Sequence, residues 1–295
     1  MNETALLNEQ FEANRSHLKS VAYRMLGSLS EADDAVQDAW IRVSRVDTSG
    51  VENLGGYLTT VVARVCLNML QSRKTRREDS LDDYYVPDPV VSRAEGTDPE
   101  EEVLLADSVG LGLLVVLEML TPTERLAFVL HDVFAVPFEE IAPIVDKTPA
   151  AARQLASRAR RRVQGRAPMT NANPLEQRRV VDAFFAAARD GDFNGLVALL
   201  DPDIVLRSDG GSQRPNFNVL VRGAAEVAGR AMSFHQPLQW VHPALINGTA
   251  GAVVAPHGRV VSVLSFTVRD GRIVAIEALA DPVRLAKLDL SAAGL

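Results

Sequence analysis

Basic residues that could bind phosphate are concentrated in two short stretches of the chain. Seven basic residues and no acid lie between Lys147 and Arg166, and five basic residues and no acid lie between Arg64 and Arg77. Guanidinium and ammonium groups neutralise backbone phosphates, so both stretches indicate contact with nucleic acid. The alternative for each is an ordinary helix whose charged face is solvated.

The formal net charge of −7 does not exclude this chemistry, because the charges are segregated. Eleven acids and a single arginine lie between Glu78 and Asp107, separating the two basic stretches. The local potential, rather than the total charge, governs contact with phosphate. The acidic stretch could occupy a basic groove, or it could repel DNA until it is moved.

Side chains suited to catalysis do not form a recognisable set. Asp209, His235, His242 and His257 could serve as acids or bases, but no spacing brings them together. The single cysteine, Cys66, lies in an apolar helical pattern and is expected to be a core residue. The sequence therefore predicts no enzyme activity, no metal and no cofactor.

The basic stretch from 147 to 166 is predicted to belong to a helix-turn-helix. Phe138 to Val145 has one apolar helical face, and the turn that follows leads to Thr148 and Pro149, which can start a helix. The second helix, about 150–164, is rich in alanine and arginine. A short helix, a tight turn and a basic second helix are typical of a DNA-reading pair. A plain helical hairpin remains the alternative.

The first half of the chain is predicted to be helical. Apolar spacing indicates helices over 5–26, 31–46 with Ser30 as its cap, and 57–72, with a glycine-containing loop over 47–56. Residues 78–102 form an acidic linker with an apolar island at 84–91 that is expected to dock or to act as a stiff spacer. Helices over 103–120 and 122–134 follow, the latter started by a Thr121–Glu124 capping box.

The C-terminal part has a different pattern, that of an α+β domain with a curved antiparallel sheet. Helices are predicted over 175–188, 194–200 and 224–232, and strands over 203–207, 239–246, 251–256, 260–268 and 273–279. The turn at 269–272 is predicted to join the last two strands as a hairpin. One cysteine, a polar N-terminus and no long apolar run favour a cytoplasmic, nucleoid-associated protein.

Two motifs occur one after the other in the chain. The first is EADDAVQDAW followed by a basic helix, and the second is LTPTERLAFVLHDVFAVPFEEIAPIVDKTPAAARQLASRARRRV. Together they resemble the bacterial RNA polymerase sigma factors of the extracytoplasmic-function type, in the subgroup with a fused C-terminal SnoaL-like domain, a relative of the nuclear transport factor 2 fold. The resemblance implies two all-α sigma domains, the second with the helix-turn-helix, followed by an α+β SnoaL-like (NTF2-like) domain. The expected boundaries are 1–77 for region 2, 78–102 for the linker, 103–167 for region 4, 168–174 for a second linker and 175–295 for the regulatory domain.

The resemblance also implies partners and site residues. Core RNA polymerase, through its β′ clamp helices and β flap, and promoter DNA would be bound. The expected polymerase-docking residues are Asp33, Asp34, Gln37, Asp38 and Trp40. The expected −10 readers are the loop 47–56 and Arg64, Asn68, Arg73, Lys74, Arg76 and Arg77, with Asn68 equally able to be a structural residue. The expected −35 readers are Thr148, Ala150, Ala151, Arg153, Gln154, Ser157, Arg158 and Arg161. Arg160, Arg161 and Arg162 would hold phosphate by position.

Three short signatures of this subgroup have counterparts that imply control by contact between the C-terminal domain and the sigma domains. The linker signature corresponds to Tyr85, Val86, Pro87, Asp88 and Pro89, with tyrosine in place of tryptophan. The glycine signature corresponds to Asp209, Gly210, Gly211, Ser212 and Gln213, where the usual lysine is lost. The terminal signature corresponds to Asp281, Pro282, Val283, Arg284 and Leu285.

Two other functions remain open from the residues alone. A one-component regulator would bind an operator with its helix-turn-helix and a small ligand with its C-terminal domain. An enzyme with a nucleic-acid-binding appendage would use the C-terminal domain for catalysis, as SnoaL-like polyketide cyclases do. Tight duplex binding without polymerase would distinguish the first, and activity of the isolated C-terminal domain the second.

Overall fold

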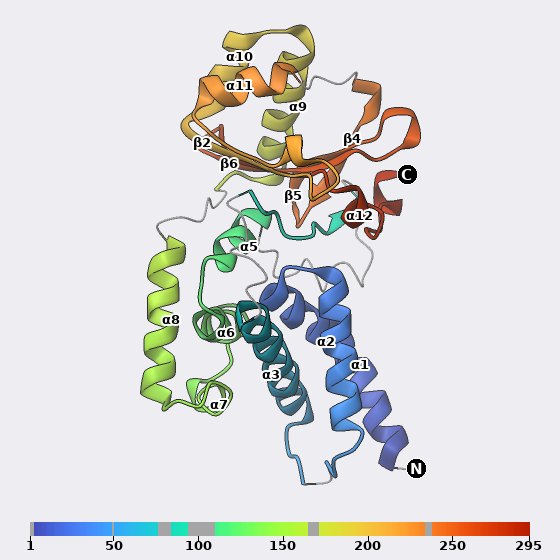
Figure 1. The fold of residues 1–295 in the computed structure, drawn as a ribbon, viewed down its shortest axis with the longest axis vertical. Coiled ribbons are helices and arrows are strands. Elements are labelled where there is room, and N and C mark those ends of the chain that lie inside the picture. Colours follow the sequence, from blue (N-terminus) through green and yellow to red (C-terminus); the bar gives the residue numbers. More distant parts are fainter. Residues whose placement is uncertain (1–2, 49, 76–83, 94–109, 165–170, 234–237) are drawn as a thin grey trace. The chain divides into compact units, whose positions relative to one another are not determined.

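A computed structural model describes residues 3–48, 50–75, 84–93, 110–164, 171–233 and 238–295 (Figure 1). These residues divide into two compact units. The first unit contains the described residues up to 75 and those of 116–164, and the second contains 84–93, 110–115 and the described residues from 171 onward. The second unit thus includes part of the acidic linker as well as the C-terminal α+β region.

Three helices begin the first unit: α1 (Glu3–Leu26), α2 (Leu29–Val43) and α3 (Leu54–Thr75). Gly27 ends α1 as expected, with a φ of +70° and its amide donating to the Tyr23 carbonyl at 2.8 Å. Several predicted boundaries were wrong. Helix α2 ends at Val43 rather than at 46, and α3 ends at Thr75 rather than at 72. Ser28, not Ser30, precedes α2, and α3 begins inside the predicted loop because Asn53 Oδ1 accepts the Gly56 amide at 3.0 Å.

The second half of this unit consists of the end of α5 (Leu111–Glu118), α6 (Pro122–Phe128), α7 (Phe138–Ile141) and α8 (Pro149–Gln164). The residues of α5 up to Val115 belong to the second unit. The predicted capping box is present, since Thr121 and Glu124 bond reciprocally at the start of α6. The predicted helix to residue 134 instead widens into a π-helix over Val129–Val133. The part of the predicted 103–120 helix before residue 110 lies outside the described residues.

A mixed sheet forms the second unit. Its strands are β1 (Val91–Ser92), β2 (Leu200–Asp209), β3 (Val219–Arg222), β4 (Val241–Ile246), β5 (Thr249–Val254), β6 (Ser262–Arg269) and β7 (Arg272–Leu279). Their order is β1-β4-β5-β6-β7-β2-β3. The β6–β7 hairpin is confirmed, but β2 pairs with β7 in parallel, so the sheet is not purely antiparallel. The short strands β1 and β3 were not predicted.

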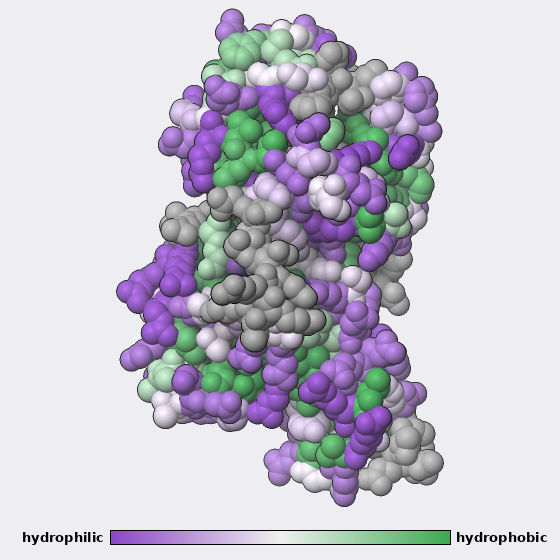
Figure 2. All heavy atoms as spheres, viewed as in Figure 1, coloured by the Kyte–Doolittle hydropathy of each residue, from purple (hydrophilic) through white to green (hydrophobic). Residues whose placement is uncertain are grey.

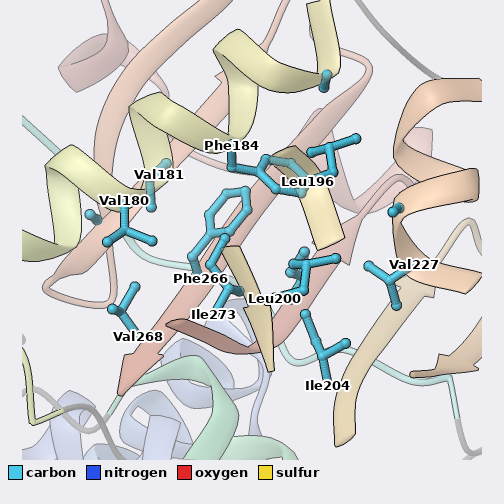
Figure 3. Packing of buried hydrophobic residues seen from close by; sticks show 14 of the residues in the cluster. Val180, Val181, Phe184, Leu196, Leu200, Ile204, Val227, Phe266, Val268 and Ile273 are labelled. Carbon is cyan, nitrogen blue, oxygen red and sulfur yellow. The ribbon is translucent and has the colours of Figure 1, made fainter. Parts of the chain in front are cut away.

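Helices α9 (Pro174–Asp190), α10 (Phe193–Leu199) and α11 (Ala224–Ser233) lie on one side of this sheet (Figure 1). The short helix α12 (Pro282–Leu285) follows β7, and 3-10 turns occupy Pro215–Phe217, Leu238–Trp240, Pro256–Gly258 and Ser291–Ala293. The apolar face of α9 packs onto β5 and β6, and Phe184 meets Phe266 edge-on with ring centroids 5.4 Å apart (Figure 3). This core holds the helices against the sheet.

Candidate nucleic-acid interface and linker-binding site

Helix α8 separates a small buried face from a basic exposed face. Its buried residues are Ala152, Leu155, Ala156, Ala159 and Val163. The exposed residues among the expected readers are Thr148, Ala150, Arg153, Gln154, Ser157, Arg158 and Arg161, and Ala151 is partly buried. Hydrophilic side chains cover the edge on which α8 lies (Figure 2). The alanine-rich side therefore seats the helix while the opposite side presents donors to a partner.

The start of α8 is held in two ways. The Thr148 hydroxyl accepts the Ala151 amide at 3.2 Å, which makes Thr148 the cap of the helix. The Arg153 guanidinium lies 5.3 Å from the centre of the Phe138 ring, and that ring stacks on His131 at 3.8 Å. Arg153 is thus oriented by an aromatic support while its charge remains exposed.

The buried carboxylate of Glu124, predicted only as part of the capping box, also fixes the later turns of α8. Glu124 accepts hydrogen bonds from Thr121 and ion-pairs with Arg162 at 2.7 Å and Arg158 at 3.4 Å. Burial opposes ionisation of Glu124, but the Thr121 hydrogen bonds and the two arginines outweigh it and lower its pKa. Arg160 pairs with Asp132. Arg160 and Arg162 therefore have carboxylate partners within the unit, besides any role at phosphate.

The expected −10 readers on α3 have different surroundings. Arg64 and Asn68 are exposed one helical turn apart, and Arg64 Nη2 donates to the Pro143 carbonyl at 3.0 Å. Arg73 ion-pairs with Glu31. The side chain of Lys74, and all of Arg76 and Arg77, lie outside the described residues.

Helix α2 presents the expected docking acids to solvent. Asp33, Asp34 and Gln37 are exposed and Asp38 is partly so. Lys19 pairs with Asp33 at 2.8 Å and Arg42 with Asp38 at 2.7 Å, and such exposed pairs exchange readily for a partner's charges. Trp40 is half-buried against Phe11, at 4.9 Å between ring centres. It therefore supports the helix from below the acidic surface.

The three signature segments meet at one arginine in the second unit. Arg284 bonds Asp88 Oδ1 through Nε at 2.7 Å, Asp209 Oδ2 through Nη1 at 2.8 Å and the Val86 carbonyl through Nη2 at 2.6 Å. Its guanidinium also lies 5.1 Å from the centre of the Tyr85 ring. Asp209 in turn accepts the Val86 amide at 3.2 Å. We call this set of residues, Tyr85, Val86, Asp88, Asp209 and Arg284, the linker anchor.

The glycines beside the anchor are required by close approach. A Cβ at Gly211, whose φ is +61°, would lie 2.4 Å from the Asp281 carboxylate, and one at Gly210 would lie 2.2 Å from the Arg214 carbonyl. Asp281 is occupied as the cap of α12, where it accepts the Val283 amide at 2.8 Å. Gln213, which replaces the usual lysine, is exposed, and Arg284 supplies the positive charge.

The linker is also held beyond the anchor by main-chain bonds. Val90 and Asn247 exchange two hydrogen bonds, with the Val90 amide donating to Asn247 Oδ1 at 3.0 Å and the Asn247 amide to the Val90 carbonyl at 2.8 Å. Val91 and Ser92 then pair with Ile246 and Leu245 as the edge strand of the sheet. The apolar island of the linker is therefore a docked segment.

The candidates for acid–base chemistry are not assembled into one site. Asp209 belongs to the linker anchor, His257 packs on Trp240 at 5.0 Å, and His235 lies outside the described residues. Cys66 is fully buried, and burial raises the pKa of its thiol to about 12. Within the described ranges, no three His, Cys, Asp or Glu side chains are grouped as a metal site, and no helix is long and apolar enough to cross a membrane.

Comparison with known proteins relates these surfaces to one family. The sigma-70 region 2 family matches residues 10–76, and the sigma-70 region 4 family matches residues 111–163. The chain is 38% identical over 286 residues to the ECF RNA polymerase sigma factor SigJ of Mycobacterium tuberculosis, covering 92% of this chain and 91% of SigJ. The chain belongs to the extracytoplasmic-function sigma factors.

Further matches extend over most of the length of this sigma factor. SigI of M. tuberculosis is 33% identical over 283 residues, 93% of each chain. The crystal structure of SigJ superposes with a TM-score of 0.78 at 35% identity, covering 96% of this chain and 99% of that one. The fold is thus two all-α sigma domains followed by a sheet-containing C-terminal domain. Family membership favours a sigma factor that binds core polymerase and promoter DNA over a one-component regulator.

Proposed function

We propose that α8 of this sigma factor reads the −35 element in the major groove. An α-helix fits that groove, and arginine and glutamine form bidentate contacts with guanine and adenine. Arg153 and Gln154 are exposed near the start of α8, where a recognition helix points at base edges. Arg161, exposed farther along, is suited to phosphate. The observation that carries this assignment is the division of α8 into a buried alanine face and an exposed basic face.

Replacing Arg153 should change specificity, whereas replacing Arg161 should not. We expect Arg153→Ala to cost holoenzyme about 1–3 kcal/mol on its preferred promoter and to relax preference at one −35 base pair. Arg161→Ala should weaken all promoters alike and reduce the salt dependence by about one phosphate contact. Promoter-duplex binding by holoenzyme, with each −35 base pair replaced in turn, measures both. An unchanged base preference for Arg153→Ala would refute its role as a reader.

The other surfaces are assigned by the same reasoning. The acidic face of α2, with Asp33, Asp34, Gln37 and Asp38 supported by Trp40, would dock on the basic β′ clamp helices. The segment before α3, together with Arg64 and Asn68, would receive the displaced strand of the −10 element. Region 4 would also contact the β flap.

We further propose that the C-terminal unit controls initiation in cis through the linker anchor, as a regulator and not as an enzyme. Residues 76–110 connect α3 to α5, so they set how far the two promoter-reading parts can separate. The described part of this connection is held by Arg284, by Asn247 and by the β1–β4 pairing. Binding or release of this segment therefore provides a means of regulation.

Run-off transcription with core RNA polymerase tests this regulation. We expect the full chain and a chain ending after Pro168 to direct transcription from the same promoter at rates that differ several-fold, about 1 kcal/mol or more. The truncated chain must first show helical circular dichroism and core binding equal to those of the full chain. Equal transcription by both chains would rule out control by the C-terminal unit.

A further inference from the structure

The second unit contains a cavity that the linker anchor does not use. It has a volume of about 470 Å³, within the range of roughly 300–1,000 Å³ that is typical of small-molecule sites. Helices α9 and α11 contribute Phe184, Phe185 and Val227 to its wall, and the sheet contributes Leu206, Leu264 and Ile276. The cavity is therefore formed by elements of one unit, is partly open to solvent and is lined mainly by apolar side chains.

All the charged side chains in the wall of the cavity are positive. Arg189, Arg214 and Arg230 line the cavity together with Ser208 and Ser262. Among the described lining residues there is no carboxylate and no histidine. A cationic ligand would meet charged side chains of its own sign here. An anionic ligand would instead be attracted, and the absence of an acid or base in the wall favours binding over catalysis.

Arg214 is better placed than Arg189 to receive an anion. Its Nη1 donates to the Val261 carbonyl at 3.0 Å and to the Ala280 carbonyl at 3.3 Å, and its guanidinium lies 5.7 Å from the centre of the Phe217 ring. No carboxylate lies within ion-pair distance of Arg214 in the part of the chain that the structure describes, whereas Arg189 already pairs with Asp190 at 2.6 Å. Arg214 is thus fixed in position with its charge uncompensated.

We propose that this cavity binds an apolar carboxylate, with its head group on Arg214 and its hydrocarbon body among the phenylalanine, leucine and valine side chains. A charge-assisted, bidentate contact with the guanidinium supplies orientation, because the donors of arginine match the two oxygens of a carboxylate. Burial of the hydrocarbon body supplies most of the affinity.

The binding residue adjoins the linker anchor through the main chain. The Ala280 carbonyl accepts from Arg214, while the Ala280 amide donates to the Asp209 carbonyl at 2.7 Å. The Arg214 amide also donates to the Gly210 carbonyl at 3.2 Å. Asp209 is the carboxylate that holds Arg284. Ligand binding would therefore alter the anchor, and this consequence, unlike the binding itself, rests on the proposed regulation.

Titration of the full chain with dodecanoate, dodecanol and dodecyltrimethylammonium tests the site without polymerase or DNA. A charge-assisted contact is worth about 1.5–3 kcal/mol, so we expect dodecanoate to bind about tenfold to a hundredfold more tightly than dodecanol, and the cation most weakly. Calorimetry gives the three dissociation constants. No binding of dodecanoate, or equal binding of the alcohol or the cation, would overturn the proposal whatever the variants do.

Variants locate the head group. Arg214→Met should remove the preference for dodecanoate over dodecanol while leaving the affinity for dodecanol within about threefold, roughly 0.6 kcal/mol. Arg222→Met, at an exposed arginine on β3 that does not line the cavity, should keep the full preference. A preference retained by Arg214→Met, or lost in Arg222→Met, would place the head group elsewhere. Because binding is measured on the free chain, its failure is distinguishable from failure of the transcriptional control.

Discussion

Replacing Arg284 by methionine should release the linker from the C-terminal unit and destabilise that unit by about 3 kcal/mol. The substitution leaves Asp88 and Asp209 buried without their cation, and breaking a buried pair from one side costs about 3–5 kcal/mol. The lower value applies because the Arg284 side chain retains 20% exposure. The amides of Val86 and Val90 donate to Asp209 and Asn247. In the variant we expect these two amides to lose nearly all of their protection against hydrogen exchange.

Two companion variants make this result specific. Arg284→Met combined with Asp88→Asn should cost less than the sum of the single changes, because the two residues are in direct contact. Arg222→Met, on the exposed face of β3, should change the free energy of unfolding by no more than about 0.5 kcal/mol. If Arg284→Met left exchange at Val86 and Val90 unchanged, the anchor would not be what holds the linker. Run-off transcription by the same variant then reports whether release alone alters initiation.

Replacing Arg125 by methionine should destabilise the first unit by about 3–5 kcal/mol. Arg125 is 2% exposed, pairs with Glu118 through Nη2 at 2.6 Å and donates from Nε to the Arg24 carbonyl at the end of α1. Loss of the guanidinium leaves the buried Glu118 carboxylate without its cation. This happens in the unit in which helices of both sigma regions pack together. Urea unfolding of the full chain, followed by a probe in the first unit, measures the change.

The matched test replaces both charges. Arg125→Met with Glu118→Leu should recover most of the lost stability, because an apolar pair can replace a buried ion pair at little cost. Arg161→Met on the exposed face of α8 should be neutral within about 0.5 kcal/mol. A double variant no more stable than Arg125→Met would show that the Arg24 carbonyl contact, rather than the ion pair, is what Arg125 contributes.

The sequence predicted the features that depend on neighbouring residues. The capping box at Thr121, the end of α1 at Gly27 and the buried apolar face at Phe138 and Ile141 follow from spacing of three or four residues, which a helix turns into contact. The order of the two sigma motifs was likewise sufficient to recognise the family. Such signals are local, so they can be recognised from the sequence without knowledge of the tertiary structure.

The features that only the tertiary structure decided join residues far apart in the chain. Arg284 meets Asp88 across 196 positions and Asp209 across 75, and Arg125 meets the Arg24 carbonyl across 101. Glu277 lies inside β7 as a carboxylate among apolar residues, and its full burial raises its pKa to about 7, although the positive charge of Arg207, opposite it on β2, acts to lower that pKa. The parallel β2–β7 pairing belongs to the same class. Sequence periodicity determines which face of an element is apolar, but which charges meet depends on how the elements pack.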